Sequence, residues 1–349
     1  MGPVGDERNR LWNDPLYSEA LSLQRECGVL DLHVDSIIMQ RLIRYRVEKR
    51  HQAGFRGQPF FWHADIPRMR DAGYSGACMG LHYPPVEIES GWWELQKQID
   101  YLDRLARRTP GCRRVWNPED WESAREKGEF ALAPGVEGAH MLGGKIDRVE
   151  LLATRGVAYL TLVHFCRNVF ATPSMGVGAG ERDGLTSLGR ELVCRLNGLG
   201  IGIDVAHLNR PGVLEVCQKT RAPVFCTHTG VRAVHNHARN ISDEEIDAIA
   251  STGGAIGIMF CPNFLSGRHL VGSDVVVRHI DHVVQRVGLK HVVVGTDYDG
   301  WIRIPVDQKD CRDSVRVTYG LLKMGYSMED LRPMFGSNAR RIFHKIRAS

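Results

Sequence analysis

Short apolar runs alternate along this chain with segments in which apolar residues recur every three or four positions. Eight runs have the length and composition of buried strands, at residues 29–34, 76–81, 130–136, 158–163, 201–205, 223–227, 255–259 and 292–296. In the segments between these runs, apolar residues that recur every three or four positions are typical of amphipathic helices. Strands that alternate with helices in this way pair in parallel, and eight of them predict an α/β fold, a (β/α)8 TIM-like barrel.

The helical segments have recognisable starts and apolar faces. An apolar stripe that predicts a helix after the second strand is formed by Trp92, Leu95, Ile99, Leu102 and Leu105. Asn117 before Pro118 predicts a capped helix start, and Ser242 followed by Glu245 predicts a capping box. Because no repeat or linker interrupts the chain, we expect a single barrel domain over residues 1–349. Residues 1–28 would form an N-terminal extension, and residues 328–349 would form helices packed on the barrel.

Composition narrows the class of protein. Hydrophobic residues make up 43% of the chain and charged residues 25%, which indicates a globular protein and excludes a disordered one. The formal net charge of +4 is spread along the chain, so we expect no nucleic-acid partner, and the basic stretch 41–50 is interpreted as the solvated side of a helix or loop.

Neither the cysteines nor the apolar runs indicate secretion or a membrane. The nine cysteines include no C-x-x-C pair, so a disulfide framework or zinc ribbon is not expected. No apolar run approaches the roughly 18 residues that span a bilayer. The first residues lack the apolar segment of a signal peptide. We therefore expect a cytoplasmic protein with no membrane contact.

Possible metal ligands begin at the end of the first predicted strand. His33 and Asp35 lie two residues apart, so strand alternation points both side chains to one face. The spacing alone is weak evidence, because His63 and Asp65 repeat it in a loop where Asp65 is better interpreted as a helix cap. The position at the carboxyl end of a barrel strand is what favours a site, since barrel active sites gather on that face.

The same position carries a histidine or a carboxylate in six of the eight predicted strands. These residues are His33 with Asp35, Glu137, His164, His207, His228 and Asp297. Packing alone rarely produces such a set, because parallel barrel strands are otherwise rich in Val, Ile and Leu. Histidine and carboxylate ligands suit Zn²⁺ or a similar divalent ion.

Five or six ligands fit two metal ions better than one. Four protein ligands would saturate a single tetrahedral zinc ion and leave no position for water, whereas a carboxylate that bridges two ions leaves both open. Glu137 is the candidate bridge, and a hydroxide held between two Zn²⁺ ions would be the nucleophile. Asp297 is the candidate that shuttles a proton to the leaving amine, while Asp299 is interpreted as a supporting loop residue.

Taken together, the blocks of sequence around these residues resemble the membrane dipeptidase, or renal dipeptidase, family of binuclear zinc peptidases, which have amidohydrolase-like barrels. The resemblance covers DLHVD at 31–35, residues 63–81, GVEGAH at 135–140, YLTLVH at 159–164, GLTSLG at 184–189, IDVAH at 203–207, RN at 239–240, VGTDYDG at 294–300 and GSN at 336–338. It implies a barrel of the metallo-dependent hydrolase type and a possible homodimer.

The resemblance also implies roles for individual residues. His33 and Asp35 would bind one zinc ion, His207 and His228 the other, and Glu137 would bridge them. The expected contacts with the substrate, in addition to the proton shuttle Asp297, involve His164, Arg239 and Phe260. His164 would steady the tetrahedral intermediate, Arg239 would hold the C-terminal carboxylate of the substrate, and Phe260 stands where the renal enzyme has a tyrosine.

The sequence therefore predicts a zinc dipeptidase whose substrate is a small dipeptide. Hydrolysis of a related amide, an N-acyl amino acid, a lactone or a β-lactam would need the same site and is the alternative within enzymes. A barrel that binds metal but serves as a non-enzymatic partner protein is the alternative outside them.

Overall fold

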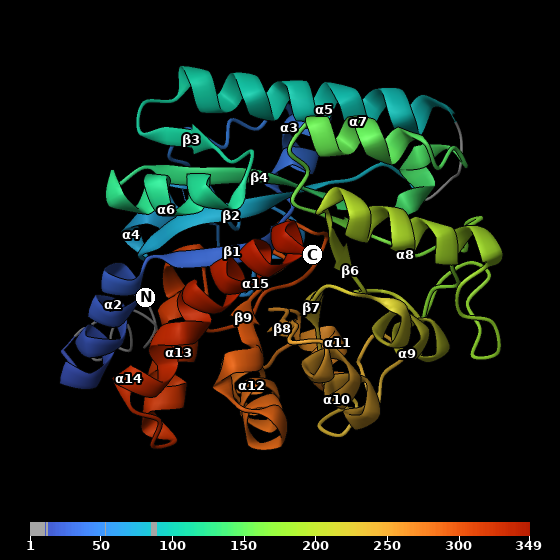
Figure 1. The fold of residues 1–349 in the computed structure, drawn as a ribbon. Coiled ribbons are helices and arrows are strands. Elements are labelled where there is room, and N and C mark those ends of the chain that lie inside the picture. The colour runs from blue at the N-terminus through green and yellow to red at the C-terminus, as the bar shows by residue number, and fades with distance from the viewer. Residues whose placement is uncertain (1–10, 12, 53, 85–88) are drawn as a thin grey trace.

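The structure is a computed structural model that describes residues 11, 13–52, 54–84 and 89–349. Its centre is a barrel of eight parallel strands, namely β1 (Val29–Val34), β2 (Tyr74–Leu81), β4 (Phe130–Glu137), β5 (Tyr159–Thr161), β6 (Gly202–Asp204), β7 (Val224–Thr229), β8 (Ala255–Ile258) and β9 (Val292–Val294). The barrel closes because β1 pairs with β2 and β9, and β2 pairs with β4 (Figure 1). This confirms the predicted (β/α)8 barrel.

One strand was not predicted from the sequence. β3 (Cys112–Arg114) pairs in parallel with the first residues of β4, with Cys112 opposite Phe130. Its three residues are a cysteine and two arginines, which offer none of the apolar alternation that marks a strand. All eight predicted runs correspond to strands of the barrel, although β5, β6 and β9 are only three residues long.

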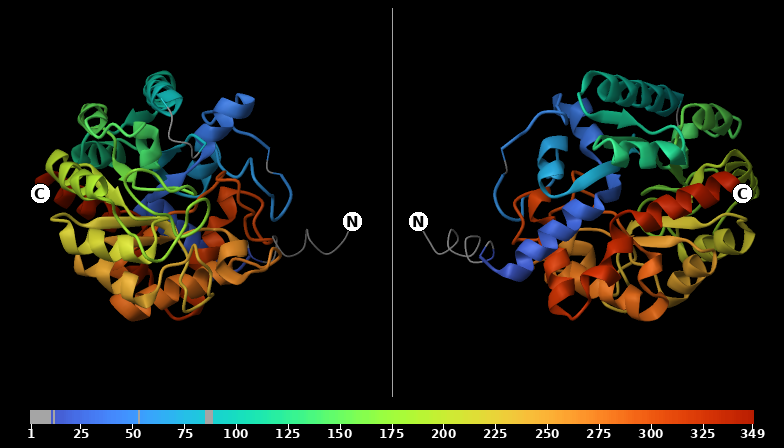
Figure 2. Two further views of the ribbon diagram at one scale, coloured as in Figure 1. Left: turned by 90° about the vertical axis from the view of Figure 1, so that its right-hand side faces the viewer. Right: turned by 60° about the vertical axis from the view of Figure 1, so that its left-hand side comes forward.

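Helices surround the barrel, as the two views of Figure 2 show. Their bounds are α2 (Pro15–Cys27), α3 (Ser36–Ile43), α4 (Ile66–Asp71), α5 (Glu89–Arg108), α6 (Pro118–Glu126), α7 (Arg148–Thr154), α8 (Ser187–Leu199), α9 (Arg210–Lys219), α10 (Asp243–Ser251), α11 (Pro262–Ser266), α12 (Asp274–Val287), α13 (Val315–Lys323), α14 (Met328–Leu331) and α15 (Ser337–Ala348). No helix among these is long and apolar enough to cross a membrane.

The predicted helix signals are confirmed. The Asn117 side chain accepts a hydrogen bond from the backbone N–H of Asp120 at the start of α6. Ser242 and Glu245 form a capping box at the start of α10. The apolar stripe from Trp92 to Leu105 on α5 is buried against the barrel.

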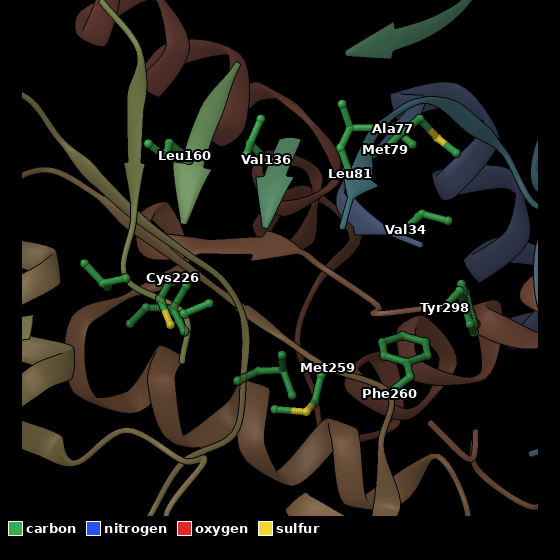
Figure 3. Close-up of a cluster of buried hydrophobic side chains, with 14 of the residues drawn as sticks. Val34, Ala77, Met79, Leu81, Val136, Leu160, Cys226, Met259, Phe260 and Tyr298 are labelled. Atoms are coloured by element: carbon green, nitrogen blue, oxygen red, sulfur yellow. The ribbon is translucent and has the colours of Figure 1, made fainter. Parts of the chain in front are cut away.

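Two apolar layers hold the barrel. Outward-facing strand residues such as Val34, Met79, Leu81 and Val136 pack in the layer between the strands and the helices, part of which Figure 3 shows. A second layer fills the barrel interior with residues such as Leu32.

The C-terminal helix closes the amino-terminal end of the barrel. Ile342, Phe343 and Ile346 of α15 belong to the same buried cluster as the interior residues, and Figure 1 shows α15 lying across this end. The Phe343 ring stacks on Trp121 with centroids 5.7 Å apart and lies 5.0 Å from the ring of Phe225. The chemistry must therefore take place at the opposite end of the barrel.

We expect Phe343→Ala to lower the free energy of unfolding by about 3 kcal/mol or more, because it removes a buried ring and leaves a cavity between α15 and the barrel. Urea denaturation followed by circular dichroism measures the change. Lys345→Ala, at an exposed position on the same helix, is the control and should change stability by less than about 0.5 kcal/mol. Equal losses in both variants would contradict a sealing role for α15.

Candidate functional site

Polar side chains from six strand ends meet at the carboxyl end of the barrel. The Oε1 atom of Glu137, the last residue of β4, lies 3.1 Å from Nε2 of His207. The same oxygen lies 3.5 Å from Nε2 of each of three further histidines, namely His33, His164 and His228. The structure therefore brings the predicted residues of β1, β4, β5, β6 and β7 around one carboxylate.

Buried Asp31 fastens the end of β1 to the end of β9. Its Oδ1 atom accepts hydrogen bonds from the backbone N–H groups of His33 at 3.1 Å and Thr296 at 3.0 Å. Its Oδ2 atom accepts a hydrogen bond from the Thr296 hydroxyl at 2.7 Å. These bonds fix the backbone of His33 and of Asp297, the residue that follows Thr296.

On the other side of the barrel, buried Asp204 connects the ends of β5, β6 and β7 by hydrogen bonds. Its Oδ1 atom accepts from the backbone N–H groups of Ala206 and Thr227, at 3.1 and 2.9 Å. Its Oδ2 atom accepts from the hydroxyls of Thr161 and Thr227, at 2.6 and 2.9 Å. One carboxylate thus joins β5, β6 and β7 where they lead into the site histidines.

The imidazole of His33 is oriented by Tyr159. The Tyr159 hydroxyl donates to the carbonyl oxygen of Leu32 at 2.7 Å, so it can only accept from Nδ1–H of His33, which lies 2.8 Å away. In the neutral ring the lone pair therefore lies on Nε2, the atom that is 3.4 Å from Asp35 Oδ1. A histidine held in this way through its second nitrogen is a typical metal ligand.

The imidazole of His228 is oriented in a similar way by the hydroxyl of Thr227. The Thr227 hydroxyl donates to Asp204 and accepts from Nδ1 of His228 at 2.9 Å. The free Nε2 of His228 then faces Nε2 of His207 at 2.9 Å. Nε2 of His207 also lies 3.1 Å from Glu137 Oε1, so nitrogen and carboxylate atoms from three strands converge at this point.

The electrostatics of the site favour cations. Burial lowers the pKa of His207 and of His228 well below the usual range, so both rings are neutral, the form that binds metal. Burial, reinforced by the charge of Asp35, raises the pKa of Glu137 and of Asp297. Among the described residues, Nε2 of His33 and Oδ1 of Asp35 have no hydrogen-bond partner.

Two overlapping groups of ligand atoms fit divalent metal ions. The first group is His33, Asp35 and Glu137, and the second is Glu137, His207 and His228; within each group the atoms lie within 4.8 Å of one another. Glu137 is the residue that the two groups share. These two groups contain the residues that the family resemblance implies as metal ligands, and two further groups of described residues meet the same distance criterion: His33 with His228 and Asp297, and His82 with Glu137 and His164.

The backbone of two site residues is held in an unfavourable conformation. His207 and Asp297 have φ angles of 65° and 63°, in the left-handed region that non-glycine residues seldom adopt. Each such residue costs on the order of 1–3 kcal/mol, which the surrounding packing and hydrogen bonds must offset. Strain of this kind is common at functional sites.

A cavity of about 500 Å³ opens onto these groups. Its wall includes Glu137, His164, Asp297 and Arg239, together with apolar residues. Arg239 is 3% exposed and donates from one guanidinium nitrogen to the carbonyl oxygen of His228 at 2.8 Å. The volume is within the range of pockets that bind small molecules.

Phe260 lies elsewhere. Its buried ring packs against the edge of Tyr298, with centroids 5.5 Å apart, as part of the apolar layer in Figure 3. The cavity is lined instead by the residues that follow it, Cys261, Asn263 and Phe264. The expected contact between Phe260 and the substrate is therefore not supported by the geometry, because the ring turns away from the cavity.

The other histidine–aspartate pair is structural. Asp65 caps α4 by accepting from the backbone N–H of Arg68 at 2.8 Å, as the sequence predicts. Nδ1 of His63 accepts from the backbone N–H of Asp299 at 3.0 Å, and the Asp299 carboxylate accepts from His63 and from the Ser36 hydroxyl. Asp299 therefore ties the loop after β9 to the loop before α4.

Sequence reasoning missed His82, which also lines the cavity. It is the first residue after β2, and its ring centroid lies 4.7 Å from that of His164. Burial lowers its pKa to about 4, so the ring is neutral. His82 could have been identified from its position in the sequence, because it directly follows the last residue of the predicted strand 76–81. Arg41, interpreted from the sequence as a solvated residue, also lines the cavity.

An eight-stranded parallel barrel with buried histidines and carboxylates at its carboxyl end defines a metal-dependent hydrolase of the amidohydrolase type. Residues 17–349 match the family model described as membrane dipeptidase, peptidase family M19. The chain belongs to this family, and it is a hydrolase of the metallopeptidase class.

Solved structures agree with this assignment. The barrel is similar to a dipeptidase AC described as a metallopeptidase of family M19, with 26% identity, a TM-score of 0.82, and coverage of 92% of this chain and 99% of that one. A metallopeptidase from Rhodobacter sphaeroides, liganded with a phosphinate mimic of L-Ala-D-Ala, has 25% identity, coverage of 91% and 99%, and a TM-score of 0.80. The probable dipeptidase PvdM from Pseudomonas aeruginosa, at 20% identity, covers 95% and 98% with a TM-score of 0.83 and shows the shared fold.

If His33 is a ligand, we expect Tyr159→Phe to weaken the binding of a divalent metal ion such as Zn²⁺ by about ten- to a hundredfold, because His33 loses the group that fixes its tautomer and orientation. Competition with a chromophoric chelator measures the affinity. Tyr326→Phe is the matched control, since it removes a hydroxyl that bonds to Asp281 outside the site. Unchanged zinc affinity in Tyr159→Phe would show that His33 does not depend on this contact.

Proposed function

We propose that this protein is a dipeptidase that hydrolyses the peptide bond of free dipeptides with two Zn²⁺ ions. His33 and Asp35 would hold one ion, His207 and His228 the other, and Glu137 would bridge them. The observation that carries the proposal is the place of Glu137 between two sets of ligand atoms in a cavity that also contains a buried arginine. The dipeptide mimic bound by the R. sphaeroides relative supports the substrate class.

Two zinc ions at these ligands would polarise the carbonyl of the scissile bond and lower the pKa of a water molecule, so that a nucleophile is available at neutral pH. Binding of the substrate carboxylate, hydrogen bonding to the carbonyl oxygen and proton transfer would be carried out by side chains of the protein. Three of them, Arg239, His164 and Asp297, line the cavity around the expected position of the peptide bond.

Arg239 is suited to the free carboxylate of the substrate. A guanidinium offers five donors in a fixed fork, and one nitrogen of Arg239 donates to the carbonyl oxygen of His228. A carboxylate gains paired, charge-assisted hydrogen bonds from such a fork. This contact would restrict the enzyme to substrates in which a free carboxylate lies one residue from the scissile bond.

His164 is suited to the carbonyl oxygen. Burial, with the nearby His82 and His140, lowers the pKa of His164 well below its usual range, so the ring is neutral. A neutral imidazole can donate one hydrogen bond to the oxygen on which negative charge develops. Its Nε2 atom lies 3.5 Å from Glu137 Oε1, which places the ring beside the metal ligands.

Asp297 is suited to move a proton. Asp297 lines the cavity beside the proposed metal ligands, where its carboxylate would take the proton from the attacking water and pass it to the leaving amine. Its backbone N–H donates to the carbonyl oxygen of His33 at 3.0 Å, which fixes the residue close to the ligands of β1.

The substrate class is tested with a panel of dipeptides, N-acyl amino acids, lactones and β-lactams on zinc-loaded protein. We expect dipeptides to be hydrolysed, and to be hydrolysed faster than lactones and β-lactams without a carboxylate at that position, because Arg239 pairs with that group. Turnover of N-acyl amino acids with none of dipeptides would overturn the proposal. If no compound in the panel is hydrolysed, the non-enzymatic interpretation gains support.

We expect Asp297→Asn to lower kcat for dipeptides by about a hundredfold or more, because the amide cannot carry the proton. The variant should still bind two metal ions per chain, measured by elemental analysis beside the wild-type protein. Asp297 also lies within 4.8 Å of ligand atoms of His33 and His228. Loss of one metal ion in the variant would therefore mean that Asp297 is a ligand and not the shuttle.

A further inference from the structure

His82 is a polar group of the cavity that the proposed chemistry does not use. Among the described residues, neither of its ring nitrogens has a hydrogen-bond partner, although both atoms are buried. A buried polar atom without a partner costs about 1–3 kcal/mol, so such a group in a binding cavity suggests that a ligand completes it. One ring nitrogen lies within 4.8 Å of ligand atoms of Glu137 and His164, so the ligand must approach the metal site.

The barrel order indicates which end of a dipeptide reaches His82. The closed ring of strands runs β2-β1-β9-β8-β7-β6-β5-β4 and returns to β2, so β7 is four strands from β2 in both directions. Arg239 follows β7 and His82 follows β2, which places them on opposite sides of the barrel mouth. A dipeptide with its carboxylate on Arg239 and its scissile bond at Glu137 would direct its amino-terminal residue toward β2.

The wall around His82 suits that amino-terminal residue. The cavity wall that follows β1, β2 and β9 contains the apolar residues Ile38, Leu42, Pro84 and Trp301 together with Asp35, Arg41 and Asp297. The apolar side chains can receive an apolar side chain of the substrate, while Asp35 and Asp297 already have the proposed roles of metal ligand and proton shuttle. His82 adds a hydrogen-bonding group that has no other role and no partner among the described residues.

A neutral imidazole is well matched to an α-amino group on this side of the cavity. The guanidinium of Arg41 donates to the carbonyl oxygen of His82 at 2.7 Å, which fixes the backbone and adds positive charge. An α-amino group, whose ordinary pKa is about 8, can donate a hydrogen bond to the imidazole nitrogen that carries no hydrogen, both as an ammonium group and as a neutral amine. A neutral amine can donate to one imidazole nitrogen or accept from the other.

We propose that His82 binds the free α-amino group of the substrate's first residue and so makes the enzyme select dipeptides over N-acyl amino acids. The inference rests on the proposed function, because it places the substrate by its carboxylate on Arg239. It adds a binding group at the β2 side of the cavity, and with it a reason for the requirement of a free amino terminus.

The test uses alanyl-alanine and N-propionyl-alanine, which differ only in the amino group, on zinc-loaded wild-type protein and His82→Ala. We expect His82→Ala to lower kcat/KM for alanyl-alanine about tenfold, mainly through KM, as the loss of one hydrogen bond worth about 1.4 kcal/mol predicts. Its kcat/KM for N-propionyl-alanine should stay within about twofold. His82→Asn, which keeps a donor and an acceptor, should restore part of the preference.

Two controls separate this effect from damage to the site. His344→Ala, on α15 at the closed end of the barrel, should leave both substrates unaffected. Elemental analysis of His82→Ala should give the wild-type number of metal ions. Fewer ions, or an equal fall for both substrates, would overturn the inference because His82 would then act on the metal site or on His164. If wild-type protein cleaves neither compound, the proposed function itself fails.

Discussion

The close approach of one buried carboxylate to four imidazole rings is the constraint on which the site depends. Glu137 Oε1 lies 3.1 to 3.5 Å from Nε2 of His33, His164, His207 and His228, and Asp35 and Asp297 add two more buried carboxyl groups. Such a cluster is costly in a protein interior unless cations neutralise the carboxylates and occupy the bare imidazole nitrogens. Both the charge of this cluster and the geometry of its ligand atoms therefore favour bound cations.

The barrel holds this cluster through buried hydrogen bonds below it. Asp31 joins β1 to β9, and Asp204 joins β5, β6 and β7, each through backbone N–H groups and hydroxyls at the points where the strands end. These bonds form where β1 and β7 lose regular register, as the pairing of β1 with β2 and of β7 with β8 shows. Regular strands would direct side chains alternately inward and outward, so the irregularity is what lets neighbouring residues serve the site.

The cavity has two chemically different sides, and this difference gives direction to a substrate. Arg239, after β7, offers charge-assisted hydrogen bonds, whereas the wall after β1, β2 and β9 combines apolar side chains with Asp35, Arg41, His82 and Asp297. Membership of the membrane dipeptidase family and the similarity to M19 structures agree with a small substrate that spans these two sides. The opposite end of the barrel is filled by α15, and the packing and hydrogen bonds around the site offset the strain of residues such as His207.

Local sequence pattern is sufficient to predict the barrel and the candidate ligands. Apolar runs mark the strands locally, and the polar residue that ends a run, such as Glu137 or His228, can be identified without knowing its neighbours. Local pattern could not reveal β3, whose three residues lack alternation, or the burial of Phe260 against Tyr298.

Only the tertiary structure decided which distant residues meet. Tyr159 supports His33 from 126 positions away, and Thr296 reaches Asp31 from 265 positions away. His82 faces His164 because β2 and β5 both flank β4 in the closed barrel. Such contacts follow from strand order, register and closure, which depend on the packing of the whole chain, whereas periodicity reports only which face of its own element a residue occupies.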